Sequence, residues 1–164
     1  MKKLLIAAML ILSCGQVSAQ ALQMRDVFKQ MPDSLMPYLS QNNRLDFIDF
    51  LDSGMRAEVK NLLGGTSEMT TLTDDALTIK MNESLRVDMF LMETASADST
   101  SQTIVMIETF LTDSIHGESV VKYFTPEWIP LTEKPQLNAE QEKRINDCIL
   151  QNILKKEEEF LNKS

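Results

Sequence analysis

A single histidine, His116, is the side chain of this 164-residue chain best suited to proton transfer near neutral pH. Asp113 and Ser119 lie within three residues of it, so a hydrolase that uses His116 with a serine or a carboxylate is one hypothesis. Catalytic groups, however, are brought together by the fold and not by nearness in sequence. We favour a tight turn, because His116 directly precedes Gly117 between two apolar runs.

Other residues with catalytic chemistry are sparse. One histidine and two cysteines are too few for a metal site built on several His or Cys ligands. The chain has no glycine-rich phosphate loop and no G-x-S-x-G motif, so no cofactor is expected. Cys148 falls near the apolar side of a helical pattern, which favours a buried thiol over a nucleophile. These observations favour a protein that is not an enzyme and holds no metal.

Three aromatic residues, Tyr123, Phe124 and Trp128, gather near the end of the last strand pattern. Aromatic rings can stack on a peptide or a glycan, which makes these residues a candidate binding platform. The alternative is that they close the end of the core. A net charge of -8 argues against nucleic acid as a partner. The function that the sequence favours is therefore binding, with another envelope protein or a glycan as the partner.

Residues 1–19 have the pattern of a secretory signal peptide. Lys2 and Lys3 precede an apolar run over residues 4–12, and Val17-Ser18-Ala19 is a small-residue cleavage site. As a helix the run would span only about 13 Å, far short of the ~30 Å of a membrane core. We expect an exported chain that begins at Gln20, without a membrane-spanning segment. The periplasm or the outer membrane, rather than the medium, is the predicted location.

An alternative lies inside the same segment. Ile11-Leu12-Ser13-Cys14-Gly15 resembles a bacterial lipobox, in which the cysteine becomes the lipidated N-terminus. Cys14 would then anchor a lipoprotein, whereas cleavage after Ala19 would release a protein without a lipid. Leu12 is larger than the residues usual at that place, so we favour cleavage after Ala19. Cys148 is then the one cysteine that remains, which excludes an internal disulfide.

The rest of the chain predicts an α+β fold. One α+β domain is expected over residues 20–137, with N-terminal helices packed on an antiparallel β-meander. Residues 138–164 follow as an additional C-terminal amphipathic helix with a charged tail, capped by Asn138. The sequence leaves open the oligomeric state and the sheet face that this last helix covers.

The boundaries of the expected elements follow from capping residues and hydrophobic periodicity. A helix is expected from Asn42 or Asn43, with Asn43 and Asp46 as a capping box and Gly54 just past its end. After Gly54 the apolar residues alternate with a period of two, and short turns connect the runs. The predicted strands cover residues 55–60, 69–72, 77–82, 85–92, 104–111 and 120–124, with a polar loop over 96–101.

Several strings of the N-terminal half carry a family resemblance. They are Met31-Pro32-Asp33-Ser34-Leu35, Pro37-Tyr38-Leu39, Asn42-Asn43-Arg44-Leu45-Asp46, Asp52-Ser53-Gly54-Met55 and Leu72-Thr73-Asp74-Asp75, with Trp128 further on. Together they resemble a family of exported proteins of unknown function from Bacteroides-type bacteria. The resemblance covers about residues 24–131. It implies an envelope location and one shared domain, and it supplies no catalytic residue.

Overall fold

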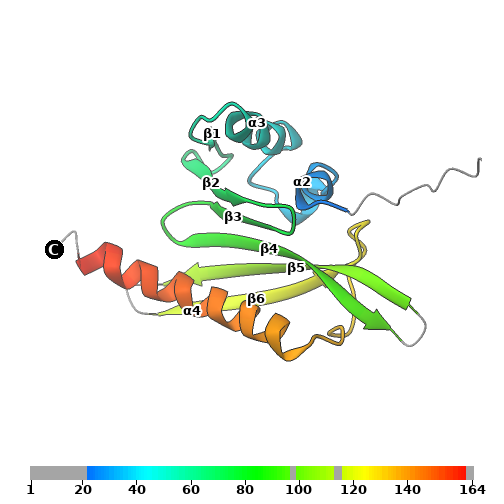
Figure 1. Cartoon of the computed structure of the whole chain (residues 1–164). Coiled ribbons are helices and arrows are strands. Elements are labelled where there is room, and N and C mark those ends of the chain that lie inside the picture. Colours follow the sequence, from blue (N-terminus) through cyan, green and yellow to red (C-terminus); the bar gives the residue numbers. More distant parts are fainter. Residues whose placement is uncertain (1–21, 97–98, 113–115, 162–164) are drawn as a thin grey trace, which may run out of the picture.

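The computed structural model describes residues 22–96, 99–112 and 116–161 (Figure 1). Within these residues, three α-helices, a short 3-10 helix and a six-stranded antiparallel sheet form an α+β fold, which confirms the predicted class. The expected signal peptide, Cys14 and Asp113 lie outside the described residues. Within the described residues, no helix combines the length and the apolar character that a membrane span requires.

The N-terminal layer consists of α2 (Met24–Lys29), a short 3-10 helix (Asp33–Leu35) and α3 (Gln41–Asp52). The N-cap of α3 is Ser40, so the predicted Asn43–Asp46 capping box is wrong. Ser40 Oγ accepts from the Asn43 N–H at 3.3 Å, and Asn43 Oδ1 accepts from the Ser40 N–H at 3.1 Å. Gly54 follows α3 with a φ of 67°, which confirms its predicted place after the helix.

A buried arginine, Arg44 of α3, holds the irregular segment before that helix. Its side chain is 1% exposed. Nη1 donates to Asp33 Oδ1 at 2.8 Å and to the Leu39 carbonyl at 3.0 Å, and Nη2 donates to the Met31 carbonyl at 2.5 Å. Nε is buried and has no hydrogen-bond partner among the described residues. The guanidinium therefore takes the place that main-chain donors would fill in a regular element.

The sheet is a meander in which each strand pairs with its neighbours in sequence, as predicted. Its strands are β1 (Glu58–Lys60), β2 (Thr66–Leu72), β3 (Ala76–Lys80), β4 (Leu85–Ser96), β5 (Ser99–Leu111) and β6 (Gly117–Phe124). The loop predicted over 96–101 is wrong, because the ladder of β4 and β5 continues to the pair Ser96 and Ser99. Polar side chains interact across this part of the ladder: the hydroxyls of the diagonal neighbours Thr94 and Thr103 lie 3.0 Å apart.

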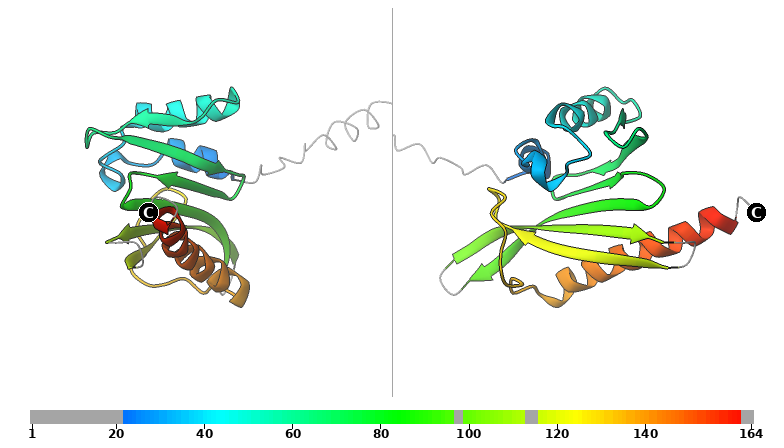
Figure 2. Two further views of the ribbon diagram at one scale, coloured as in Figure 1. Left: turned by 90° about the vertical axis from the view of Figure 1, so that its left-hand side faces the viewer. Right: turned by 180° about the vertical axis from the view of Figure 1, so that it is seen from behind.

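The two faces of the sheet carry separate cores. On β4 the side chains of one face are Val87, Met89 and Leu91, and those of the other are Asp88, Phe90 and Met92. The first face packs against α2 and α3, and the second packs against α4 (Ala139–Leu161). Figure 2 shows α4 on the opposite side of the sheet from the N-terminal helices. The sequence had left open which face of the sheet the last helix covers. The structure shows that α4 covers the face opposite to the N-terminal helices.

The N-terminus of α4 is capped as predicted. Asn138 Oδ1 accepts from the Gln141 N–H, and Gln141 Oε1 accepts from the Asn138 N–H, both at 2.9 Å. Ile145, Cys148 and Ile149 contribute to the core between α4 and the sheet. Cys148 contributes to this core but is half-buried, so it is less enclosed than the buried thiol that the sequence favoured.

Candidate functional site

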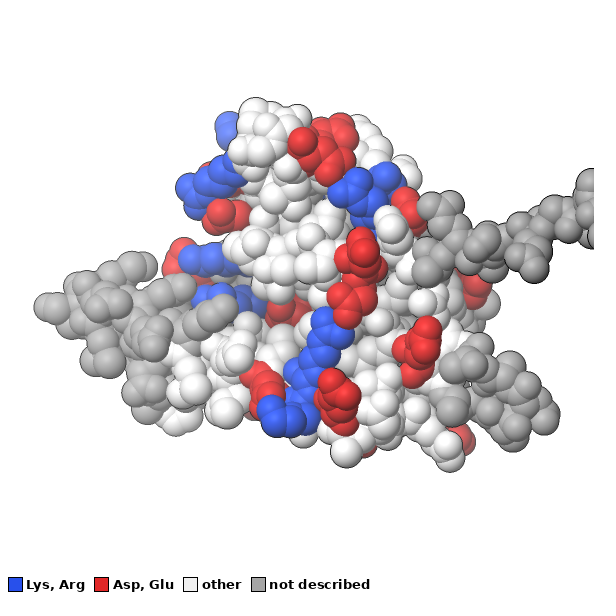
Figure 3. Space-filling view, viewed as in Figure 1, with Lys and Arg blue, Asp and Glu red and all other residues white. Residues whose placement is uncertain are grey.

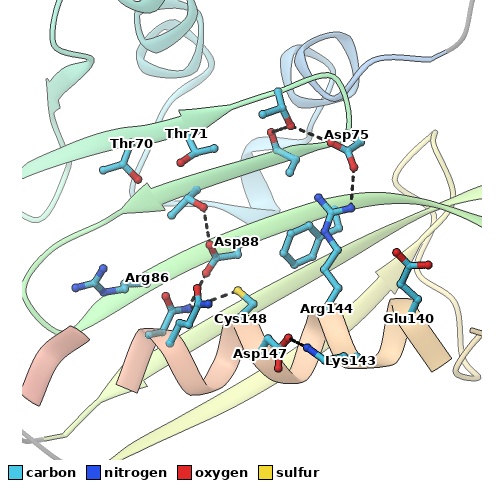
Figure 4. A pocket seen from close by; sticks show the side chains of 16 residues that line it. Thr70, Thr71, Asp75, Arg86, Asp88, Glu140, Lys143, Arg144, Asp147 and Cys148 are labelled. Atoms are coloured by element: carbon cyan, nitrogen blue, oxygen red, sulfur yellow. Dashed lines mark hydrogen bonds and ion pairs between the residues drawn. The ribbon is translucent and has the colours of Figure 1, made fainter. Parts of the chain in front are cut away.

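A groove of about 720 Å³ lies between α4 and strands β2 to β4 (Figure 4). It exists because α4 packs over β4 and β5 and leaves the same face of β2 and β3 uncovered. The sheet wall consists of Thr70, Thr71, Thr73, Asp75, Ala76, Thr78, Arg86, Asp88 and Phe90. The helix wall consists of Glu140, Lys143, Arg144, Asp147, Cys148, Gln151 and Asn152.

A β-bulge in β2 shapes the sheet wall. The pairing of β2 with β3 shifts between Met69, which is opposite Ile79, and Thr71, which is opposite Thr78. Thr70 is the extra residue, so Thr70 and Thr71 both line the groove. Met69 and Leu72 remain on the core side of the strand. Without the bulge, one of the two threonines would be directed into the apolar core.

The floor of the groove is a buried polar network centred on Asp88, which is 3% exposed. Its carboxylate accepts from Thr78 Oγ1 and from Asn152 Nδ2, each at 2.7 Å. Asn152 Nδ2 also lies 3.3 Å from Thr109 Oγ1, which is hydrogen-bonded to Ser119 Oγ at 3.0 Å. The network joins α4 to the sheet through side chains of β3, β4, β5 and β6. These hydrogen bonds hold the polar side chains of the groove floor in fixed positions.

One end of the groove is bounded by an ion pair between the helix and the sheet. Arg144 Nη1 donates to Asp75 Oδ2 at 2.7 Å, and Thr73 Oγ1 donates to Asp75 Oδ1 at 2.9 Å. The Arg144 guanidinium also lies 4.5 Å from the centre of the Phe90 ring. The hydrogen bond from Arg144 lowers the pKa of Asp75 below its usual value.

The substitution D75N is expected to destabilise the protein by less than about 1 kcal/mol at pH 7, because the Asp75 side chain is half exposed. The pKa of Asp75 is lower in the folded state than in the unfolded state. The ionised Asp75 therefore makes its full contribution to the free energy of unfolding above the unfolded-state pKa of about 3.9, and this contribution is lost as the pH falls through the folded-state pKa. Urea unfolding of the wild type and of D75N at a series of pH values should show that their difference in the free energy of unfolding becomes smaller in acid.

The neighbouring D74N variant is the control for that series. Arg144 donates to Asp75, and the hydrogen bonds of the described residues include none to the Asp74 side chain. D74N should therefore leave the acid slope of stability close to that of the wild type. A D75N difference that is independent of pH would contradict the assignment.

The two described residues of the hydrolase hypothesis, His116 and Ser119, do not line the groove. His116 is exposed, and its carbonyl accepts from the N–H and the hydroxyl of Thr112, each at 3.0 Å, as in a turn. Ser119 lies on β6, in the network beneath α4.

The predicted aromatic platform is divided between the two faces of the sheet. Phe124 and Trp128 are buried beside the N-terminal helices, with ring centroids 5.5 Å apart. Trp128 Nε1 donates to the Val27 carbonyl at 2.9 Å. Tyr123 is half-buried on the other face, near α4. The rings of Phe124 and Trp128 therefore belong to the core, the alternative role that the sequence left open.

The groove residues were missed in the sequence, although two patterns point to them. Met69 and Leu72 are three residues apart within a strand whose period is two, and such an extra residue is typical of a bulge. On α4, Glu140, Arg144, Asp147 and Gln151 recur at helical spacing beside the apolar stripe. Within the part of the chain that the structure describes, no group of three or more His, Cys, Asp or Glu could hold a metal ion.

Comparison with known proteins shows the family and the fold. No similar sequence was found among curated proteins. A solved structure, "Structure of a domain of an uncharacterized protein from Porphyromonas gingivalis W83", superposes with a TM-score of 0.55 at 21% identity. The similarity covers 71% of this chain and 59% of that chain, and at this identity it shows the fold alone. The model of the family described as "Protein of unknown function (DUF3256)" matches residues 16–163. The chain therefore belongs to the DUF3256 family.

Proposed function

We propose that the protein is an exported, non-enzymatic binding module of the cell envelope whose ligand lies in the groove between α4 and strands β2 to β4. The observation that carries the proposal is the bulge that directs Thr70 and Thr71 together into the groove. Bulges are over-represented next to functional sites, where they redirect a side chain. The signal-peptide pattern of residues 1–19 supports export.

The chemistry of the groove favours a neutral, hydroxyl-rich ligand, and we infer a glycan chain. Four carboxylates and three basic groups line it, so the charges nearly balance although the whole chain carries -8. Lys143 is paired with Asp147 and Arg144 with Asp75, which leaves little net field for a charged ligand. Figure 3 shows basic and acidic side chains next to one another on the face that carries α4.

The groups left to contact a ligand both donate and accept hydrogen bonds. The Thr70 and Thr71 side chains are exposed on the sheet wall, and Gln151 is exposed on the helix wall. Hydroxyl and carboxamide groups match the hydroxyls of a sugar, which also donate and accept. The hydrolase alternative has no comparable support, because His116 does not line the groove.

Cys148 offers a built-in test, because it lines the groove and is the only cysteine after residue 14. In the C14S protein, the rate of alkylation of Cys148 by a small maleimide can be followed by mass. Neutral oligosaccharides, such as oligomers of N-acetylglucosamine, should slow that rate and give a binding isotherm by calorimetry. No protection and no heat from any member of the panel would contradict a glycan ligand.

Matched variants on one strand test the position of the site. The double variant T70A/T71A removes two hydroxyls and should weaken binding by about tenfold, since each hydrogen bond contributes ~0.5–1.5 kcal/mol. Thr66 is another exposed threonine of β2 and does not line the groove, so T66A should bind as the wild type does. If T66A and T70A/T71A weaken binding equally, the ligand does not bind at Thr70 and Thr71 in the groove.

A further inference from the structure

The outer edge of β6 is open over most of its length. β6 is the last strand of the sheet, and it pairs with β5 on one side (Figure 1). Residues 125–131 fold back along its C-terminal end, where the Leu131 N–H donates to the Tyr123 carbonyl at 2.8 Å. Over Gly117–Lys122, no strand of the described residues lies on that outer side. An open edge is a template for another strand.

The bond from Leu131 fixes which main-chain groups face outward. The Tyr123 carbonyl points away from β5, and the direction of these groups alternates along an antiparallel strand. Ser119 and Val121 therefore also present their N–H and C=O groups at the open edge. Glu118, Val120 and Lys122 bond to β5 instead, and their side chains are exposed on one face of the strand.

We propose that a second copy of this chain pairs with β6 in an antiparallel manner, with the two-fold axis at Val120. In this register Ser119 of one copy exchanges main-chain hydrogen bonds with Val121 of the other. Glu118 then lies opposite Lys122 of the second copy, and by symmetry the pair occurs twice. The charges along this edge are thus complementary to those of a second, antiparallel copy of the same edge. This self-complementarity favours a second copy of the chain over an unrelated strand as the partner.

The neighbouring registers lose this complementarity. If the axis moves to Ser119, Glu118 lies opposite Val120, and if it moves to Val121, Glu118 lies opposite Phe124. Opposite charges across a non-hydrogen-bonded pair stabilise antiparallel strands, and like charges destabilise them. The charges of β6 therefore select one register among those that its main chain allows.

Apolar side chains lie at the centre of the proposed seam. Val120 is 45% exposed and Phe110 of β5 is 44% exposed. They are diagonal neighbours, because Val120 is opposite Glu108 and Phe110 is opposite Glu118. Pairing at Val120 brings the two valines together at the axis, with the Lys122–Glu108 ion pairs around them. An apolar centre with a charged rim is the usual build of a protein interface.

Complementary charge variants test the register. At about 100 µM, the wild-type protein should sediment as a dimer. E118K and K122E should each be monomeric under the same conditions, because each places like charges opposite one another and weakens dimerisation by at least about tenfold. An equimolar mixture of the two variants should regain the dimer, since every lysine then faces a glutamate.

Two controls separate a loss of pairing at β6 from a general effect of charge or from misfolding. E127K makes the same charge change at an exposed residue outside β6 and should leave the dimer intact. Circular dichroism and thermal unfolding of E118K and K122E check that each is folded. A monomeric wild type, a dimeric E118K, or a mixture that stays monomeric would overturn the proposal. Because β6 does not line the groove, these outcomes are independent of ligand binding.

Discussion

Replacing Arg44 with methionine is expected to lower the free energy of unfolding by about 2–4 kcal/mol. Methionine keeps much of the apolar stem, so the main loss is the guanidinium itself. The carbonyls of Met31 and Leu39 would lose their donor in a buried place, at a cost of about 1–3 kcal/mol for each group. Chemical unfolding in urea, followed by circular dichroism, measures the difference.

Two further variants show which of the Arg44 bonds matters. D33N removes the charge of the third partner, whose side chain is 65% exposed, and should cost less than about 1 kcal/mol. R44K keeps the positive charge without the planar fork and should fall between R44M and the wild type. If R44M unfolds within about 0.5 kcal/mol of the wild type, the arginine does not hold the segment.

Replacing Trp128 with alanine is expected to destabilise the protein by about 3–5 kcal/mol. The side chain is 5% exposed, contacts the Phe124 ring and donates to the Val27 carbonyl. W128F keeps a ring but removes one of the two donors to that carbonyl, which still accepts from the Gln30 N–H at 3.1 Å, so this variant should cost only about 0.5–1.5 kcal/mol from the lost bond. Far-UV circular dichroism follows the transition in all variants, because Trp128 is the only tryptophan and fluorescence would report on the wild type alone.

The adjacent residue supplies the control. Ile129 is 60% exposed, so I129A should stay within about 0.5 kcal/mol of the wild type. A surface platform at Trp128 would produce the opposite pattern, in which W128A loses ligand and keeps its stability. That result would place the tryptophan in binding and not in the core.

Much of the fold was predictable from hydrophobic periodicity and turn residues. On β3 the core residues Leu77 and Ile79 alternate with the polar residues Thr78 and Lys80, and the meander follows from the short turns between strands. The extension of β4 and β5 through residues 96 and 99 was not predictable from hydrophobicity. It accompanies hydrogen bonds between polar side chains on the two strands, such as the one between the hydroxyls of the diagonal neighbours Thr94 and Thr103.

The groove was harder to predict, because it depends on where α4 lies. The polar stripe of α4 resembles any solvated helix face until the helix is placed beside the uncovered part of β2 and β3. The burial of Arg44 was also not predictable from the sequence, because it depends on tertiary structure. Its neighbours in sequence suggest an exposed helix position, and it is buried only because residues 31–40 wrap around it.

The strictly sequential strand order has a consequence for the order of folding. Each strand meets its partner across a short connection, so the sheet can grow by one hairpin after another, and such local pairing favours fast folding. The bond between Trp128 and Val27 joins residues 101 positions apart and closes a far longer loop. We therefore expect the N-terminal helices to dock onto the chain beyond β6 late in folding. Substitutions at that contact should then mainly accelerate unfolding and leave the folding rate almost unchanged.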